Sequence, residues 1–292
     1  MDQYASGSQQ GTELYRPPAR SSAATARPDQ FSKFTVRGAL RVPEITAYFW
    51  IIKALSTALG ESTSDYLVHA ISPVVAVGIG FIGFVAALWL QLSVRRYIAC
   101  SYWLGVVMVG VFGTMAADVL HVGFHVPYII SSILYGFALA AVFITWYLTE
   151  RALSIHTIDT MRRELFYWAA VVATFAMGTA VGDLTAVTFK LGYDYSIVLF
   201  AAMIMIPAIG FRWLRWNAVF AFWFAYVVTR PLGASVADWI GKPKIVGGLG
   251  VGDGPVAVTL TFLIACLVAF LAITRKDVQG RRPGRHKARH GA

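Results

Sequence analysis

Charged residues and cysteines are scarce in this chain. Asp, Glu, Lys and Arg make up only 14% of its 292 residues, while 57% of the residues are hydrophobic. Soluble domains carry about 25% charged residues, so this composition excludes a soluble globular enzyme and indicates a polytopic membrane protein. The two cysteines, Cys100 and Cys266, are far apart and lie in or beside apolar segments. They exclude a disulfide framework and a cysteine-rich zinc site.

Motifs for catalysis and nucleotide binding are also missing. The glycine-rich segment 247–254 lacks the Gly-Lys-Ser/Thr end of a P-loop. No nucleophile elbow accompanies the Ser, His and Asp residues. We therefore expect neither enzymatic activity nor a prosthetic group. The net charge of +10 lies in the tails and in alternate loops, a distribution that sets membrane orientation and argues against a nucleic-acid partner.

Eight apolar segments are long enough to cross a bilayer as helices, which takes about 20 residues each. They span residues 46–67, 72–93, 99–121, 127–149, 165–187, 195–213, 217–240 and 255–274. The pattern predicts an all-α polytopic membrane protein with a transmembrane domain over residues 45–275. Polar, Ser- and Pro-rich composition predicts a disordered basic tail over residues 1–44, and a second basic tail covers residues 276–292.

Lys and Arg residues are distributed unequally between the two sides of the predicted membrane domain. Most of them lie in the tails and in the turns after the second, fourth and sixth segments. The opposite side has only Lys190, Lys242 and Lys244. Because Lys and Arg are retained in the cytoplasm, we expect both termini to be cytoplasmic.

A motif is repeated four times along the chain. An aromatic-Trp pair stands ten residues before a Gly, and the Gly stands five residues before an Asp; the Trp residues are Trp50, Trp103, Trp168 and Trp223. The repeats cover about residues 45–96, 97–151, 162–215 and 216–275, with two predicted helices in each. Two helices return the chain to its starting side, so successive repeats run parallel. We expect a pseudo-fourfold or two-plus-two bundle with the first helix of each repeat around its centre.

The motif acids are expected to lie at one depth in the membrane. If each Trp ring lies at the cytoplasmic interface, every Asp is about 22 Å further along its helix, in the outer part of the bilayer. Because intramembrane carboxylates are costly, they predict a cation site. The residue after each Gly shares the face of its Asp and adds further oxygens. The predicted cation ligands are Asp65, Asp118, Asp183 and Asp238, with Glu61, Thr114 and Thr179 as auxiliary ligands. The alternative is that each Asp ends its helix with local bonds and each Gly is only a packing notch.

Two cations and two histidines accompany these acids. Arg230 lies deep in the seventh segment, and we expect it to pair with motif carboxylates as a counter-charge. Lys53 either shares that role or extends to the lipid headgroups, and the second interpretation is favoured because Lys53 is shallow. Pro231 predicts a break in the helix at residues 229–233. His69 and His121 lie one helical turn after an Asp, so they are weaker candidates for metal ligands.

The segments 42–46, 49–53, 57–61 and 229–234 resemble a family of uncharacterised bacterial integral membrane proteins defined by a tandem repeat of unknown function. The resemblance covers about residues 42–275. It implies a bacterial inner-membrane protein of four two-helix repeats, and it supplies no activity or catalytic residues. A looser likeness links the paired acidic motifs to small bacterial exporters of divalent cations, by analogy only.

The favoured hypothesis is a secondary transporter that exports a divalent metal such as manganese in exchange for protons. The metal is its substrate, and the lipid bilayer is its other partner. The alternatives are a cation or proton channel that uses the same acids, and a structural or sensory membrane protein whose polar repeats only hold helices together. The sequence leaves the oligomeric state open.

Overall fold

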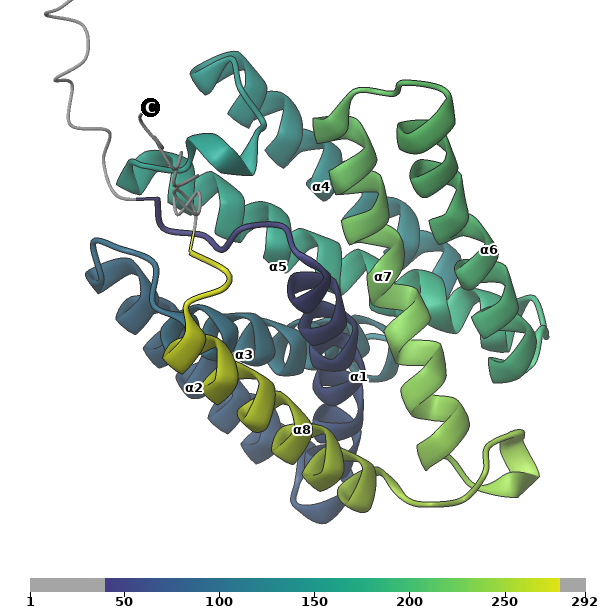
Figure 1. Cartoon of the computed structure of the whole chain (residues 1–292). Coiled ribbons are helices and arrows are strands. Elements are labelled where there is room, and N and C mark those ends of the chain that lie inside the picture. Colours follow the sequence, from purple (N-terminus) through teal and green to yellow (C-terminus); the bar gives the residue numbers. More distant parts are fainter. Residues whose placement is uncertain (1–39, 279–292) are drawn as a thin grey trace, which may run out of the picture. The chain divides into compact units, whose positions relative to one another are not determined.

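The computed structural model describes residues 40–278, which form eight α-helices and no strand (Figure 1). The helices are α1 (Ala47–Ala70), α2 (Pro73–Ser93), α3 (Ala99–Asp118), α4 (Tyr128–Glu150), α5 (Met161–Asp183), α6 (Gly192–Trp213), α7 (Ala218–Gly241) and α8 (Asp253–Thr274). Seven of them, all except α1, are long and apolar enough to cross a membrane. The prediction of an all-helical polytopic membrane protein is confirmed at this level. Most of the two predicted tails, residues 1–39 and 279–292, lies outside the described residues.

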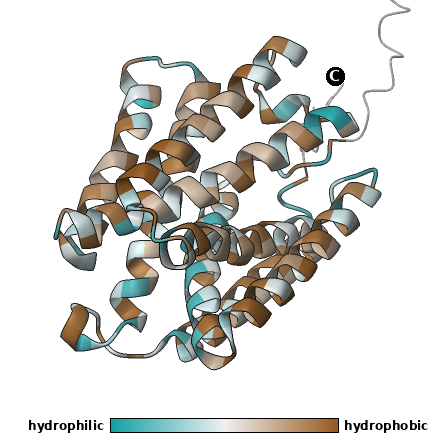
Figure 2. Cartoon of the chain, turned by 180° about the vertical axis from the view of Figure 1, so that it is seen from behind, coloured by the Kyte–Doolittle hydropathy of each residue, from teal (hydrophilic) through white to brown (hydrophobic). Residues whose placement is uncertain are grey.

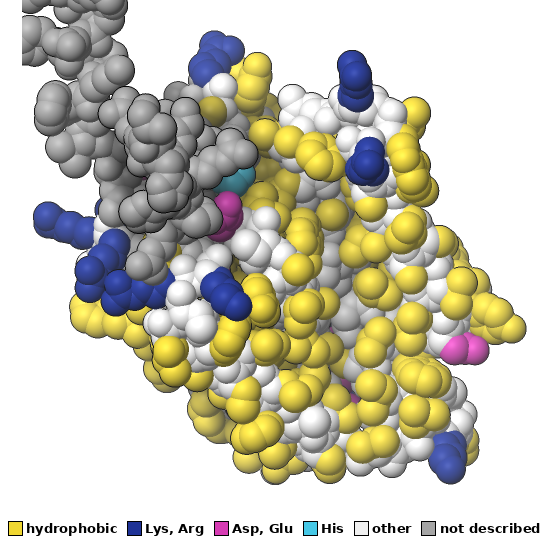
Figure 3. Space-filling view, viewed as in Figure 1, with side chains coloured by type: hydrophobic (Ala, Val, Ile, Leu, Met, Phe, Trp, Pro, Cys, Tyr) yellow, Lys and Arg dark blue, Asp and Glu magenta, His cyan; other side chains and the backbone are white. Residues whose placement is uncertain are grey.

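Helix α1 carries several charged and polar residues in its middle, where protein surrounds it. It carries Lys53, Glu61 and Asp65, all three buried, and packs against α3, α7 and α8. The outer helices α2, α4, α6 and α8 keep most of their surface exposed, because only 17–28% of each span is buried inside the protein. Much of the bundle is coloured hydrophobic in Figure 2. Apolar side chains also cover much of the face in Figure 3, and most Lys and Arg side chains lie toward its upper and left ends. Such a surface suits lipid rather than water.

The odd-numbered helices form a closed ring in sequence order. Helix α1 packs against α3 and α7, and α5 packs against the same two helices on the other side. Each even-numbered helix packs chiefly against the odd-numbered helix that follows it: α2 on α3, α4 on α5, α6 on α7, and α8 on α1 (Figure 1). A repeat is therefore not a self-contained hairpin, because its second helix covers the next repeat.

The motif glycines provide the close contacts of this ring. A Cβ at Gly60 would lie 2.8 Å from the Gly110 carbonyl carbon, and one at Gly113 would lie 3.0 Å from Phe175 Cβ. The contacts of the other two motif glycines are of the same kind: Gly178 meets Arg230 and Gly233 meets Thr57. Each motif glycine thus faces the residue three positions before the glycine of the next repeat. Small residues allow helices to approach this closely in membranes, and the repeat places one at every joint of the ring.

The aromatic pairs close the ring at the end where its helices begin. The first aromatic of each pair contacts the Trp of the next repeat, with ring centroids 5.7–6.0 Å apart. The eight residues, which we call the aromatic layer, are Phe49, Trp50, Tyr102, Trp103, Tyr167, Trp168, Phe222 and Trp223. Trp103, Trp168 and Trp223 are buried inside the protein. The neighbouring repeat provides the contacts of these three rings, and their expected depth at the cytoplasmic interface stays a prediction.

The predicted break in the seventh helix does not occur. Helix α7 runs without interruption through Pro231. Proline removes the donor that would otherwise bond Val227 O, four residues earlier in the helix. Nearby, Thr229 Oγ1 donates to Ala225 O at 2.6 Å, and Thr57 Oγ1 lies 3.4 Å from Thr229 O. Proline is tolerated inside transmembrane helices where neighbouring helices pack around it.

The chain segment before α1 lies across the end of the bundle that carries the aromatic layer. Arg41 N donates to Ile158 O, and Glu44 N donates to Asp277 O at 2.8 Å. Arg41 Nη1 also pairs with the buried Glu164 carboxylate at 2.6 Å. Residues 40–44, which the sequence assigns to the tail, thus join three separate parts of the chain.

The contact at Gly60 gives a test of the ring. Gly60→Ala places a methyl group against the Gly110 backbone, which cannot move aside as a flexible side chain would. Overpacking of this kind costs about 1–3 kcal/mol. The melting temperature of the purified protein should fall by several degrees, read from Trp fluorescence in detergent. Gly136→Ala is the control, because a Cβ there meets nothing within 4 Å. Equal melting temperatures for the two variants would contradict the close contact.

Candidate ion-binding site

Arg230 is the centre of a buried polar cluster. Its Nη2 donates hydrogen bonds to Glu61 Oε2 at 2.6 Å, Thr114 Oγ1 at 2.5 Å and Thr179 Oγ1 at 2.6 Å. The three acceptors are the residues that follow the motif glycine in the first three repeats, and they come from α1, α3 and α5. The fourth repeat has Ala234 at this position. One guanidinium on α7 thus connects all four helices of the ring.

Space for the Arg230 side chain comes from the absence of a side chain on α5. A Cβ at Gly178 would lie 2.3 Å from Arg230 Cγ and 2.7 Å from Arg230 Cβ. The motif glycine of the third repeat therefore has a second function beyond helix packing. It provides the room in which a long cationic side chain reaches the middle of the bundle.

Lys53 is a second buried cation in the ring. Its Nζ lies 4.2 Å from the ring centroid of Phe175 and 4.3 Å from that of Tyr226, at distances typical of cation–π contacts. Lys53 is fully buried, so the interpretation that it extends to the lipid headgroups is wrong. At this depth α1 is enclosed by its neighbours, and the side chain meets their aromatic rings instead of lipid.

Both buried cations have donors that are not satisfied by the described residues. Lys53 Nζ, Arg230 Nε and Arg230 Nη1 have no hydrogen-bond partner there. The great majority of buried polar groups in proteins are hydrogen-bonded, so unpaired charged donors at the centre of a bundle are unusual.

Three carboxylates meet beside Arg230, at the joint between α1 and α7. Oxygen atoms of Glu61, Asp65 and Asp238 all lie within 4.8 Å of one another, and all three residues are buried. We call them the acid triad. Oxygen ligands at this spacing suit hard cations such as Mg²⁺, Ca²⁺ and Mn²⁺. The two helices that supply them, α1 and α7, are neighbours in the ring because α7 closes it.

Lys242 provides the acid triad with a counter-charge. Its Nζ lies 2.5 Å from Asp65 Oδ2 and 3.9 Å from Asp238 Oδ1. Lys242 follows the end of α7; burial lowers its pKa, but attraction to Asp65 and Asp238 outweighs burial and leaves the pKa above its ordinary value. The ammonium group is therefore charged at neutral pH. Sequence reasoning counted Lys242 only as a loop lysine, although its position four residues after Asp238 was a usable signal.

The other two motif acids occupy a different place from the acid triad. Asp118 and Asp183 are half-buried at the ends of α3 and α5, and each is followed by a π-helical turn, Val119–Gly123 or Leu184–Thr188. Their charges interact with each other and with those of Glu61 and Asp65. The expected set of four motif Asp residues thus divides into two pairs, and only Asp65 and Asp238 lie close enough to Glu61 to share one ion.

The remaining predicted ligands face other groups. Thr114 and Thr179 are bonded to Arg230, although Thr114 Oγ1 also lies 3.4 Å from Glu61 Oε2. His69 Nδ1 is 2.6 Å from the Asp65 backbone carbonyl. His121 Nδ1 is 2.8 Å from Val126 O, and its ring stacks on Tyr128. The structure brings neither histidine into the acid triad.

Two cavities in the described part of the chain lie elsewhere. One is at the seam between α4 and α7, and the other lies between the start of α3 and the end of α8. Neither is lined by the acid triad or by Arg230. Neither of these two cavities is lined by any of the four motif Asp residues.

The pairing of Arg230 with Glu61 can be tested by a double-mutant cycle. Arg230→Met leaves Glu61 buried without its partner, and breaking a buried ion pair in this way costs about 3–5 kcal/mol. Adding Glu61→Gln removes the unpaired charge, so the double variant should melt at a higher temperature than Arg230→Met alone. Arg162→Met is the control: it breaks a pair with Glu150 in which the Arg side chain is 67% exposed, and little change is expected. Additive effects in the cycle would contradict a direct interaction.

Comparison with known proteins finds one family. A family model described as "Repeat of Unknown Function (DUF347)" matches residues 48–97, 101–152, 166–215 and 221–277. The four matched segments coincide closely with the four repeats of the motif. The chain matches no curated protein and no solved structure.

Proposed function

Because the chain belongs to the family described as a repeat of unknown function (DUF347), whose description names no activity, we propose a function from the site alone. The protein is a secondary transporter that moves a divalent cation across a membrane, with the acid triad as its central site. The observation that carries this proposal is the convergence of Glu61, Asp65 and Asp238 within 4.8 Å inside a bundle of apolar helices. Ionisable residues at such positions mark ion pathways in membrane proteins.

The chemistry of the triad favours a hard divalent cation. Its ligands are carboxylate oxygens alone, the donor set that suits manganese, magnesium and calcium more than zinc or copper. Two buried cations, Lys53 and Arg230, and the half-buried Lys242 stand against the three triad carboxylates, so these charges balance when all six groups are ionised. An incoming cation must therefore displace Lys242 from Asp65 or exchange with protons. We accordingly propose manganese-like export in exchange for protons, with no prosthetic group and no enzymatic activity.

The aromatic layer favours a transporter over an open channel. Its ring-to-ring contacts join all four ring helices at the end opposite the acid triad. Passage of an ion through that layer requires the helices to move, which is a property of alternating access. The cyclic contacts support a pseudo-fourfold arrangement. The distribution of Lys and Arg supports cytoplasmic termini in a bacterial inner membrane.

A structural role is the second candidate. Its support is that Glu61 and Asp65 already have cationic partners within the chain, Arg230 and Lys242. Under that interpretation the polar cluster only orders the ring, and no ion is bound.

Transport assays distinguish the two functions. Asp65→Asn and Asp238→Asn should each reduce Mn²⁺ flux in proteoliposomes by at least about tenfold, since each removes a charged ligand. Asp194→Asn, at an exposed position on α6, is the matched control and should leave the flux unchanged. Unaltered flux in both triad variants, together with lower melting temperatures, would support the structural role.

Removal of the competing ammonium should strengthen cation binding. Lys242→Met leaves the triad with one more uncompensated negative charge, and Coulomb attraction then favours a divalent ion. We expect the affinity for Mn²⁺ to rise about tenfold in calorimetry at pH 7. Lys244→Met is the control, because Lys244 is nearby and forms no ion pair with a carboxylate among the described residues. Weaker binding after Lys242→Met would indicate that this lysine positions Asp65 and does not compete with the ion.

A further inference from the structure

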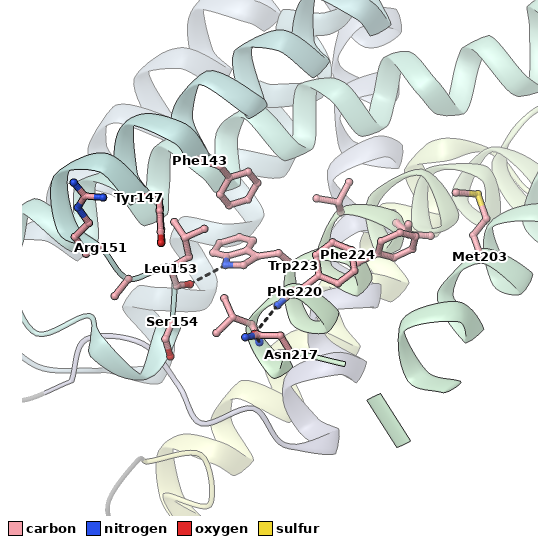
Figure 4. A pocket seen from close by; sticks show the side chains of 14 residues that line it. Phe143, Tyr147, Arg151, Leu153, Ser154, Met203, Asn217, Phe220, Trp223 and Phe224 are labelled. Carbon is pink, nitrogen blue, oxygen red and sulfur yellow. Dashed lines mark hydrogen bonds between the residues drawn. The ribbon is translucent and has the colours of Figure 1, made fainter. Parts of the chain in front are cut away.

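A groove on the side of the bundle has features that the proposed transport site does not explain. It lies where the end of α4 and the loop after it face the first half of α7, with Met203 of α6 at its edge. Its volume is about 790 Å³, within the range of small-molecule sites. The lining is mostly aromatic and aliphatic, and α7 together with its N-cap residue Asn217 provides half of its residues (Figure 4).

The polar residues of the groove gather at one end. In Figure 4, Arg151, Ser154 and Asn217 lie at the left and bottom of the view, whereas Phe224 and Met203 lie toward the right. The groove is therefore amphipathic along its length. A small inorganic anion alone would leave most of the groove unfilled, because most of its surface is apolar and provides no hydrogen-bond donor to an anion.

The polar end has donors available for an anionic group. Arg151 is exposed and makes no ion pair within the described residues, whereas Arg162 and Arg163 both pair with Glu150. Asn217 uses its Oδ1 to accept from Val219 N and Phe220 N, which leaves its amide nitrogen as a donor. Both residues stand at helix ends, at the level where a membrane-spanning helix reaches the headgroups.

An equivalent seam elsewhere in the bundle is partly covered by another segment of the chain. The second cavity lies between the end of α8 and the start of α3, two repeats away from the first in the ring, and it is lined by Arg275 and Ile98 at the corresponding helix ends. There Leu40 and Val42 of the segment before α1 form part of the wall. The seam between α4 and α7 has no such segment among its lining residues.

We propose that this groove binds a phospholipid of the surrounding leaflet. The phosphate group accepts hydrogen bonds from Arg151 and Asn217, and one acyl chain lies against Phe143, Trp223 and Phe224. Charge complementarity at one end and apolar lining along the rest select a phospholipid over a free phosphate or a fatty hydrocarbon. Because Trp223 belongs to the aromatic layer, the bound chain contacts the ring that holds the bundle together. This proposal is independent of whether the acid triad transports an ion.

The test uses phosphatidylglycerol with a photoreactive group in one acyl chain. The full-length protein in detergent is labelled, and labelled peptides are identified by mass spectrometry. We expect labels within residues 143–154 and 217–228, and we expect unlabelled phosphatidylglycerol to compete. Arg151→Gln should reduce this labelling about fivefold, the loss expected when one charge contact to an anionic headgroup is removed.

Blocking variants and a charge control complete the test. Met203→Trp and Val219→Trp, two independent substitutions in the groove wall, should each reduce labelling about tenfold, with correct folding checked by melting temperature. Arg212→Gln removes a basic residue outside the groove and should change nothing. Labels spread evenly over the outer faces of α2 and α8, or labelling unaffected by either Trp variant, would overturn the proposal. Crosslinks between two copies through the groove would also overturn it and assign the surface to a dimer.

Discussion

The buried Arg230 guanidinium imposes the strongest constraint on this fold. A cationic side chain in the interior of a membrane bundle needs hydrogen-bond acceptors and a compensating charge, because no water of the bulk phase is available there. Glu61 provides the charge, and Thr114 and Thr179 provide further acceptors. The acceptors come from three different helices, so the requirement of one side chain fixes the mutual position of all four ring helices. Gly178 is part of the same constraint, since any larger residue would occupy the space of the Arg230 side chain.

The four repeats differ in sequence around Arg230, and these differences make the ring asymmetric. At the residue three before each motif glycine, the chain has Thr57, Gly110, Phe175 and Arg230. A symmetric ring would place four arginines or none at this position, and four buried guanidinium groups would repel one another. A single arginine is compensated by the single glutamate at the position after the motif glycine. Asymmetry between repeats therefore brings the acid triad to the joint between α7 and α1, away from Asp118 and Asp183.

The two ends of the ring differ in chemistry. At one end the aromatic layer fills the centre with rings that contact one another around the cycle. At the other end carboxylates and Lys242 meet, and Lys242 retains 21% exposure of its side chain. This polar centre is closed by aromatic packing on one side and has a partly exposed ion pair on the other. The groove between α4 and α7 borders the closed side, because Trp223 lines the groove and also belongs to the aromatic layer.

The sequence by itself determined the eight helices, the four repeats and the identity of the polar positions that matter. Hydrophobic length and the spacing from Trp to Gly to Asp are local properties, and local properties are readable without coordinates. The glycine at each joint was also evident as a packing position. Only the tertiary structure decided which polar residues meet. It assigned Thr114 and Thr179 to Arg230, selected two of the four Asp residues for the triad, added Lys242 and buried Lys53 between two rings. These outcomes depend on which helices become neighbours when the ring closes and on how deeply each is enclosed, and neither quantity is encoded in the periodicity of a single segment.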